Sequence, residues 1–222
     1  MSKVIIYGMP RSSLSRTVRI ACIEKQISFE FRTKGIQSPG AEPTPELLQF
    51  NPFGKVPVLV HDNLVLYETS AICRYIDDAF DGPLLRPVRK DKVARMEQWI
   101  SVATTRLDTQ ILRQFVIPMV FADTEQRNDL GFAVRMKRMG DLIAHDLKIL
   151  DPHYDDGWLF GQRFTIPDML IMPMIHYLKA MPGGPEILAE VPNLDTAFKN
   201  FQARHSAAVT DPLLPDRILR TA

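Results

Sequence analysis

Residues 4–16 read VIIYGMPRSSLSR and determine the first element of the fold. The apolar run 4–7 predicts a strand, Gly8 to Pro10 predict a turn, and the serines that follow open a helix-patterned stretch. The positions three or four apart on that helix are Leu14, Val18, Ala21, Cys22 and Lys25, with Arg16, Arg19 and Glu24 off this face. The sequence therefore predicts a strand, a serine-rich turn and a helix.

Ser12 and Ser13 stand at the predicted helix start. The first turn of a helix has backbone N–H groups without intrahelical partners and about half a positive charge, so it stabilises an anionic sulfur or oxygen. Serine is also a preferred N-cap. Capping alone and the binding of an anion therefore both remain open for this turn.

Two later segments carry related signals. Residues 51–60, NPFGKVPVLV, form a turn into a β-branched run, so Pro57 is expected at a strand start and is a candidate for a cis peptide bond. The backbone of Val56 is then open to pair with an extended peptide. Residues 64–72, LVLYETSAI, predict a short strand, followed by a helix start whose free N–H groups suit a carboxylate.

The serine turn 10–16, the segment 51–57 and the segment 68–72 resemble, in this order and spacing, the cytosolic glutathione transferases. The likeness covers the whole chain and points to the serine-type classes, phi, theta and zeta. It implies an α/β thioredoxin-like N-terminal domain over residues 1–84 and an all-α helical C-terminal domain over residues 91–222. Since SSLS stands where a redox C-x-x-C would lie, disulfide exchange is not expected.

The resemblance also implies an activity and its residues. Glutathione would be the co-substrate, and its thiolate, stabilised by a hydrogen bond from Ser12, would be conjugated to hydrophobic electrophiles. Ser12 matches the catalytic serine of these classes when Val18 is aligned, with Ser13 and Ser15 in reserve. Other readings are a non-catalytic ligandin, a transferase-like interaction module, or a glutathione-dependent isomerase or ether-cleaving enzyme.

The glutathione-binding residues are matched position by position. Val56 would pair its backbone with the cysteinyl part, cis-Pro57 would hold that turn, Glu68 and Thr69 would meet the γ-glutamyl end, and Lys55 would lie near the glycyl end. Lys55 as an ordinary exposed lysine and Thr69 as an ordinary cap remain alternatives. The chain departs from the family pattern where Thr69 replaces the usual serine and where residues 41–45, AEPTP, lack the basic residues of phi enzymes.

The electrophile pocket is expected between the domains. Its candidate residues are Met9, Arg11, Phe115 and Met119, each of which is open to a packing or surface role instead. The family is usually dimeric, so the resemblance implies a homodimer.

Composition indicates a globular protein without a nucleic-acid partner. The 222 residues are 45% hydrophobic and 24% charged with a net charge of +1, and the part before Leu85 has nine basic and nine acidic residues. The start Met1-Ser2-Lys3 lacks a signal-peptide core and no segment is patterned to span a membrane, so the cytoplasm is expected.

Cys22 and Cys73 are expected as buried free thiols. No histidines have ligand spacing, and no metal site is predicted.

Residues 85–90 are the predicted linker, because the pattern changes there from short strands and turns to long helical periods. Before the linker the sequence predicts the element order β-α-β-α-β-β-α. One helix is expected from Asp91 to about Ala122, ended or kinked at Pro118, and a second from Thr124 to Leu150. The second has a core stripe at Phe132, Met136, Met139, Ile143, Leu147 and Leu150. Thr165 and Asp168 form a predicted capping box, which we assign to folding.

Overall fold

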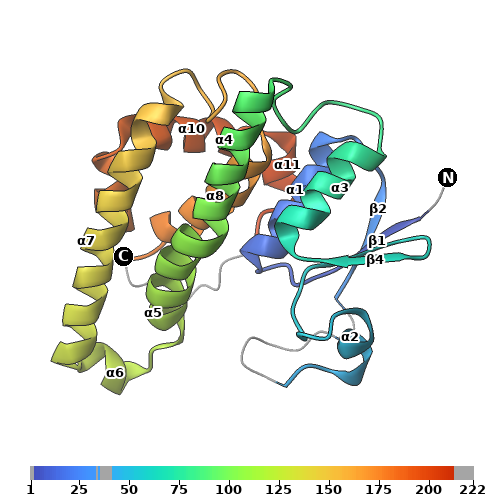
Figure 1. Ribbon diagram of the computed structural model, residues 1–222. Helices are drawn as coiled ribbons and strands as arrows, with labels where there is room; N and C mark the ends of the chain where they lie inside the picture. The colour runs from blue at the N-terminus through green and yellow to red at the C-terminus, as the bar shows by residue number, and fades with distance from the viewer. Residues whose placement is uncertain (1–2, 34, 36–41, 213–222) are drawn as a thin grey trace. The chain divides into compact units, whose positions relative to one another are not determined.

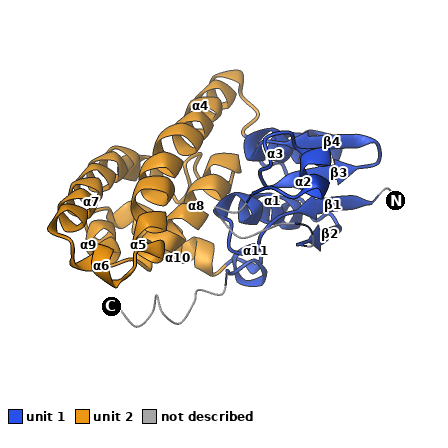
Figure 2. Ribbon diagram, turned by 90° about the horizontal axis from the view of Figure 1, so that it is seen from below, with its two compact units in different colours: residues 1–86, 204–213 blue, residues 87–203, 214–222 orange. Residues whose placement is uncertain are grey.

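The computed structural model describes residues 3–33, 35 and 42–212. The predicted start at Met1-Ser2 and Ala41 of the segment 41–45 lie outside this range. The chain divides into two compact units, residues 1–86 with 204–213 and residues 87–203 with 214–222 (Figure 2). The segment 204–213 therefore belongs to the first unit, although the predicted domain ranges group it with the helices.

The first unit has the predicted element order β-α-β-α-β-β-α, followed by one late helix (Figure 1). Its elements are β1 Val4–Tyr7, α1 Ser13–Glu24, β2 Phe29–Arg32, α2 Pro45–Phe50, β3 Val58–His61, β4 Leu64–Tyr67, α3 Thr69–Ala79 and α11 His205–Val209. The sheet order is β2-β1-β3-β4, with β1 parallel to β2 and both other pairs antiparallel. This is the expected thioredoxin-like α/β arrangement.

Both faces of the sheet are covered, and the residues of β1 alternate between them. Val4 and Ile6 are buried, and α1 contacts both β1 and α3. On the other face, Tyr7 stacks on Phe50 of α2 with ring centroids 4.8 Å apart. Since β1 is paired on both sides, it places the turn that follows it, residues 8–12, at a fixed edge of the sheet.

The second unit is helical. Its elements are α4 Lys90–Ser101, η1 Val102–Val116, α5 Ile117–Phe121, α6 Thr124–Asn128, α7 Leu130–Leu150, η2 Asp151–Tyr154, α8 Ile166–Lys179, α9 Gly184–Ala189 and α10 Pro192–Gln202. Helical turns run from Lys90 to Phe121, close to the predicted helix, with i→i+5 hydrogen bonding in η1. The α-helical pattern resumes at Ile117, and Pro118, which has no N–H, stands in the first turn of α5.

The predicted single helix from Thr124 to Leu150 is wrong. Asp129 is extended, with φ −74° and ψ 124°, and divides the stretch into α6 and α7. Its carboxylate accepts a hydrogen bond from the Phe132 N–H at 2.6 Å, so it caps the second helix. The predicted apolar stripe of α7 is half-buried at Phe132 and becomes fully buried from Ile143 onward.

The predicted capping box at the start of α8 is confirmed. The Asp168 carboxylate accepts hydrogen bonds from the Thr165 N–H at 2.8 Å, from the Thr165 hydroxyl at 2.6 Å and from the Leu159 N–H at 3.1 Å. Asp168 is completely buried, and its burial raises the pKa of the carboxyl to about 6 although these hydrogen bonds lower it. The carboxyl therefore joins the 159–165 loop to α8.

Asp168→Ala is expected to lower the free energy of unfolding by about 0.5–2 kcal/mol at pH 7 because the cap is lost. A carboxyl whose pKa rises on folding stabilises the fold most below its unfolded pKa and loses that contribution as pH rises through the folded value. The difference between wild type and variant should therefore be larger at pH 4.5 than at pH 7, as measured by urea unfolding at both values. A difference that grows with pH would contradict this assignment.

The two cysteines lie on α1 and α3, which pack against each other in the first unit. Cys22 and Cys73 are both free and completely buried, as expected. Burial raises the pKa of the Cys22 thiol well above its usual range and that of Cys73 to about 12. Neither thiol is therefore a nucleophile in the folded chain.

A thiol reagent such as dithionitrobenzoate is expected to label neither cysteine of the folded protein and both after denaturation, because only unfolding exposes them. The measurement is the absorbance of released thionitrobenzoate with and without guanidinium. Rapid stoichiometric labelling under native conditions would contradict the buried, protonated state of these thiols.

Candidate active site in the first unit

The turn after β1 is tied to the first turn of α1. The Met9 N–H donates to the Ser15 hydroxyl at 3.3 Å, and the Ser12 N–H donates to the Met9 carbonyl at 3.0 Å. A Cβ at Gly8 would come within 2.8 Å of both the Phe31 ring and the Ser15 hydroxyl, so only glycine fits there. These contacts fix where the serines stand.

Ser12 is the N-cap of α1. Its hydroxyl oxygen accepts a hydrogen bond from the Ser15 N–H at 3.2 Å, so the capping interpretation is correct as far as it goes. Among the described residues nothing accepts the hydroxyl proton of Ser12, and its side chain is half-buried. A capping hydroxyl accepts and can still donate, so the cap leaves a donor at the helix start. The reserves Ser13 and Ser15 are buried.

The 51–57 turn is built around Asn51. Its buried side chain accepts a hydrogen bond from the Phe53 N–H at 3.0 Å and donates to the Lys55 carbonyl at 2.8 Å. The Val56–Pro57 peptide is cis, as the sequence predicted, and β3 begins at the next residue. Within the described part of the chain, nothing hydrogen-bonds to the backbone N–H or carbonyl of half-buried Val56. Its backbone is therefore open for pairing.

Glu68 has an unusual backbone conformation directly before α3. Its φ is +70° and ψ 110°, a region that costs a non-glycine residue about 1–3 kcal/mol. The side chain is exposed and makes no capping bond, and no described residue pairs with the carboxylate. Such strain persists where the position of a side chain matters, so Glu68 is a candidate binding residue.

The other two predicted glutathione-binding residues differ in their exposure to solvent. Lys55 is exposed, and Thr69 is 5% exposed in the first turn of α3. Of the segment that lacks basic residues, Thr44 caps α2 by accepting from the Leu47 N–H at 3.2 Å, and Glu42 is exposed. The described part of this segment thus offers a helix cap and no cation.

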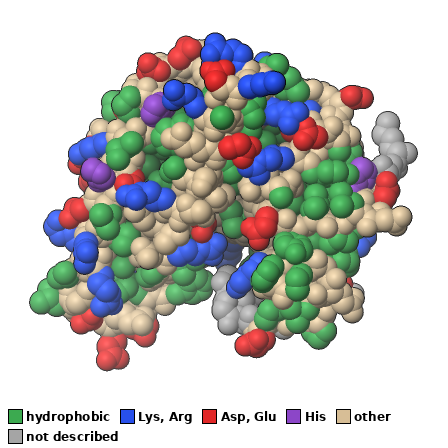
Figure 3. All heavy atoms as spheres, in the orientation of Figure 1, with side chains coloured by type: hydrophobic (Ala, Val, Ile, Leu, Met, Phe, Trp, Pro, Cys, Tyr) green, Lys and Arg blue, Asp and Glu red, His purple; other side chains and the backbone are tan. Residues whose placement is uncertain are grey.

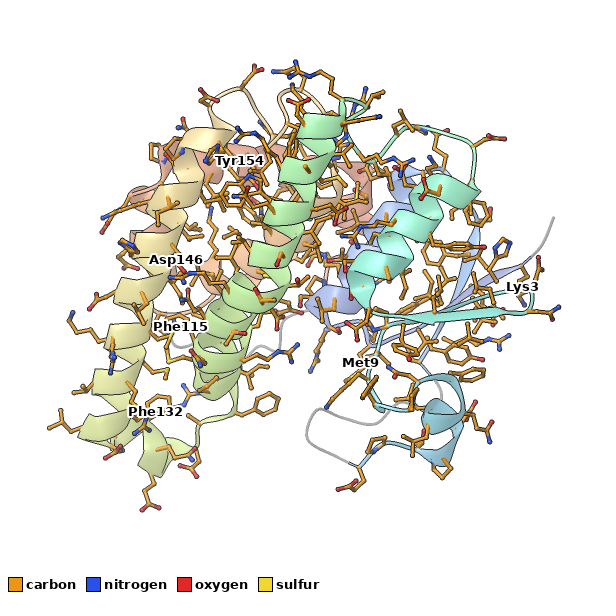
Figure 4. All side chains as sticks on the ribbon, in the orientation of Figure 1. Lys3, Met9, Phe115, Phe132, Asp146 and Tyr154 are labelled. Atoms are coloured by element: carbon orange, nitrogen blue, oxygen red, sulfur yellow. The ribbon has the colours of Figure 1, made fainter. Side chains whose placement is uncertain are left out.

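A cavity of about 420 Å³ lies within the first unit, beside the serine turn. Its lining residues are Met9, Pro10, Arg11, Arg19, Phe31 and Asp211. Two of the four electrophile-pocket candidates, Met9 and Arg11, therefore line one cavity. Phe115 and Met119 belong to the second unit, where Phe115 of η1 is buried and Met119 of α5 is half-buried (Figure 4 labels Met9 and Phe115).

Arg16 is buried, although the helix pattern placed it off the apolar face. Its guanidinium donates to the Thr210 hydroxyl at 3.2 Å and to the Ala207 carbonyl at 3.1 Å. On the same helix, Glu24 accepts from Arg204 at 2.8 Å. These partners lie about 190 residues further along the chain, so no local pattern could reveal them.

Asn51 and Arg19 were also missed as site residues. Asn51 had a usable signal, since asparagine before Pro-Phe-Gly is a typical turn former whose side chain bonds two residues onward. Arg19 lines the same cavity as Met9 and Arg11, but helix periodicity only assigned it to the polar face.

Neither a metal centre nor a membrane-spanning helix is found among the described residues. The described residues contain no group of three or more His, Cys, Asp or Glu side chains able to hold a metal ion. No helix in the described ranges is long and apolar enough to cross a membrane. Figure 3 shows basic and acidic side chains interspersed on the visible face, consistent with the balanced charge of the sequence.

Comparison with known proteins identifies the family. Residues 6–84 match the glutathione S-transferase N-terminal domain and residues 112–208 the C-terminal domain. Glutathione S-transferase 1 of Dianthus caryophyllus is 34% identical over 90% of this chain and 89% of its own, and glutathione S-transferase 3 of Zea mays is 28% identical over 97% and 96%. The structure of glutathione S-transferase III in its apo form, 26% identical, superposes over 96% of this chain and 98% of its own with a TM-score of 0.76. The chain belongs to the glutathione S-transferase family.

Proposed function

We propose that this transferase conjugates the glutathione thiolate to hydrophobic electrophiles, with Ser12 as the group that stabilises the thiolate. The observation that carries the proposal is the geometry of Ser12: it caps α1, keeps a hydroxyl proton available, and is less buried than Ser13 and Ser15. Family membership supplies the co-substrate.

A hydroxyl at a helix start can supply the free energy needed to lower the pKa of a thiol by about two units. A free thiol with a pKa near 8.5 is only a few per cent ionised at neutral pH, and lowering the pKa by about two units requires about 2.7 kcal/mol. A hydrogen bond to a charged partner contributes about 1.5–3 kcal/mol and a helix N-terminus about 0.3–1 kcal/mol. The hydroxyl of Ser12 together with the start of α1 therefore suffices.

The rest of the first unit offers matching groups for the peptide. Val56 has an open backbone beside cis-Pro57, suited to antiparallel pairing with the cysteinyl residue. Glu68, exposed and without a described partner, suits the α-amino group of the γ-glutamyl end, and the start of α3 at Thr69 suits its carboxylate. Lys55 is proposed for the glycyl carboxylate.

Three further parts of the proposal follow from the sequence and from the family. The helical residues 91–222 contribute Phe115 and Met119 to the electrophile pocket. The protein functions as a homodimer. It acts in the cytoplasm.

Ser12→Ala is expected to abolish the lowered pKa of bound glutathione, because the donor to sulfur is removed. The measurement is the pH titration of thiolate absorbance near 240 nm with glutathione bound, in wild type and variant. Ser13→Ala is the matched control, and it should keep the wild-type titration. Loss of the shift in Ser13→Ala but not in Ser12→Ala would place the active hydroxyl one residue later. A wild type that binds glutathione without lowering its pKa would favour a ligandin.

Glu68→Gln is expected to raise the KM for glutathione about tenfold or more, because the ion pair with the α-amino group is worth about 1.5–3 kcal/mol when charge-assisted. Glutamine has a side chain of the same size as glutamate. Like glutamate, it is not glycine, so the backbone strain at φ +70° is the same in both proteins. Glu125→Gln, at an exposed position of α6, serves as the control in the same steady-state assay. Equal KM values for both variants would remove Glu68 from the binding site.

A further inference from the structure

The cavity beside the serine turn combines an apolar lining with charge. Met9, Pro10 and Phe31 supply the apolar part, and the charged residues are Arg11, Arg19 and Asp211. Two cations against one carboxylate give the lining a net positive charge. A volume of about 420 Å³ is within the range of small-molecule sites.

Arg19 is the half-buried cation of this lining, whereas Arg11 is exposed. Its guanidinium lies over the Phe31 ring, 4.6 Å from the centroid, and its Nη2 donates to the Val209 carbonyl at 3.1 Å. The Nε atom is buried and has no acceptor among the described residues. Burial lowers the pKa of this guanidinium, because desolvation disfavours its charged form.

A purely structural role for Arg19 does not explain its buried Nε atom, which has no acceptor among the described residues. One hydrogen bond to Val209 and the contact with Phe31 already hold the side chain in place. A buried donor without an acceptor is costly, and an anionic oxygen is the partner that removes this cost best. The stacked, partly desolvated guanidinium therefore favours an anion over a neutral group.

We propose that the cavity selects flat, apolar electrophiles that carry a carboxylate, with Arg19 as the specificity-determining residue that pairs with it. This inference rests on the proposed function, since Met9, Pro10 and Arg11 of the lining are the three residues before Ser12. For an aryl chloride, the thiolate attacks the ring carbon, the C–S bond forms, and chloride leaves with the electron pair of the C–Cl bond. The thiol proton has already passed to solvent.

The test compares two electrophiles that share the reacting group. These are neutral 1-chloro-2,4-dinitrobenzene and anionic 4-chloro-3,5-dinitrobenzoate. Arg19→Gln should lower the ratio of kcat/KM for the benzoate to that for the neutral compound by about tenfold or more, as expected for a lost charge-assisted hydrogen bond. Arg19→Lys, which keeps the charge but not the planar fork, should lower the ratio less. Arg138→Gln, at an exposed position of α7, is the control and should retain the wild-type ratio.

A ratio that stays the same in Arg19→Gln would overturn the inference. If this variant does not fold, Arg11→Gln replaces it, because it removes the other cation from an exposed loop position and should lower the same ratio. An unchanged ratio there would equally count against an anion site.

Binding separates this inference from the proposed activity. Unreactive 3,5-dinitrobenzoate is titrated calorimetrically into wild type and Arg19→Gln. If wild type conjugates neither electrophile but binds the benzoate, and the variant binds it at least tenfold more weakly, the proposed activity fails while the anion site stands. If wild type conjugates the neutral compound but does not bind the benzoate, the anion site fails while the activity stands.

Discussion

The close approach of Gly8 to Ser15 and Phe31 is the constraint on which the site depends. Because residue 8 has no side chain, the backbone after β1 can pass close to Ser15 in the first turn of α1. The Met9 N–H can then reach the Ser15 hydroxyl, and Ser12 falls at the cap. A larger residue would move the turn, the cap and one wall of the cavity together.

A second constraint joins distant parts of the first unit. Buried Arg16 and half-buried Glu24, both on α1, hold residues 204–210 through hydrogen bonds to side chains and to a carbonyl. The hydrogen bonds from Arg204 and Ser206 lower the pKa of Glu24 against the opposing effect of its burial. This segment supplies Val209, which positions Arg19, and the next residue after it, Asp211, lines the cavity. The late helix α11 is therefore part of the site's framework.

Local pattern predicted most of the fold and part of the site. The order of seven elements, the capping box at Thr165 and Asp168, and cis-Pro57 all depend on neighbours in sequence, and all are present. The burial of Arg16 could not be predicted, since its partners lie far away in the chain. The break at Asp129 was missed because the apolar period of α7 continues across a residue whose side chain prefers a cap to a helix interior.

The burial of the two thiols protects the protein itself from alkylation. A transferase of this kind works among compounds that alkylate sulfur, and any exposed cysteine of its own would compete with glutathione for them. Cys22 and Cys73 lie out of reach between α1 and α3, protonated and fully covered. The fold thus leaves glutathione, the replaceable co-substrate, as the thiol available to the proposed electrophiles, and neither cysteine of the chain is consumed.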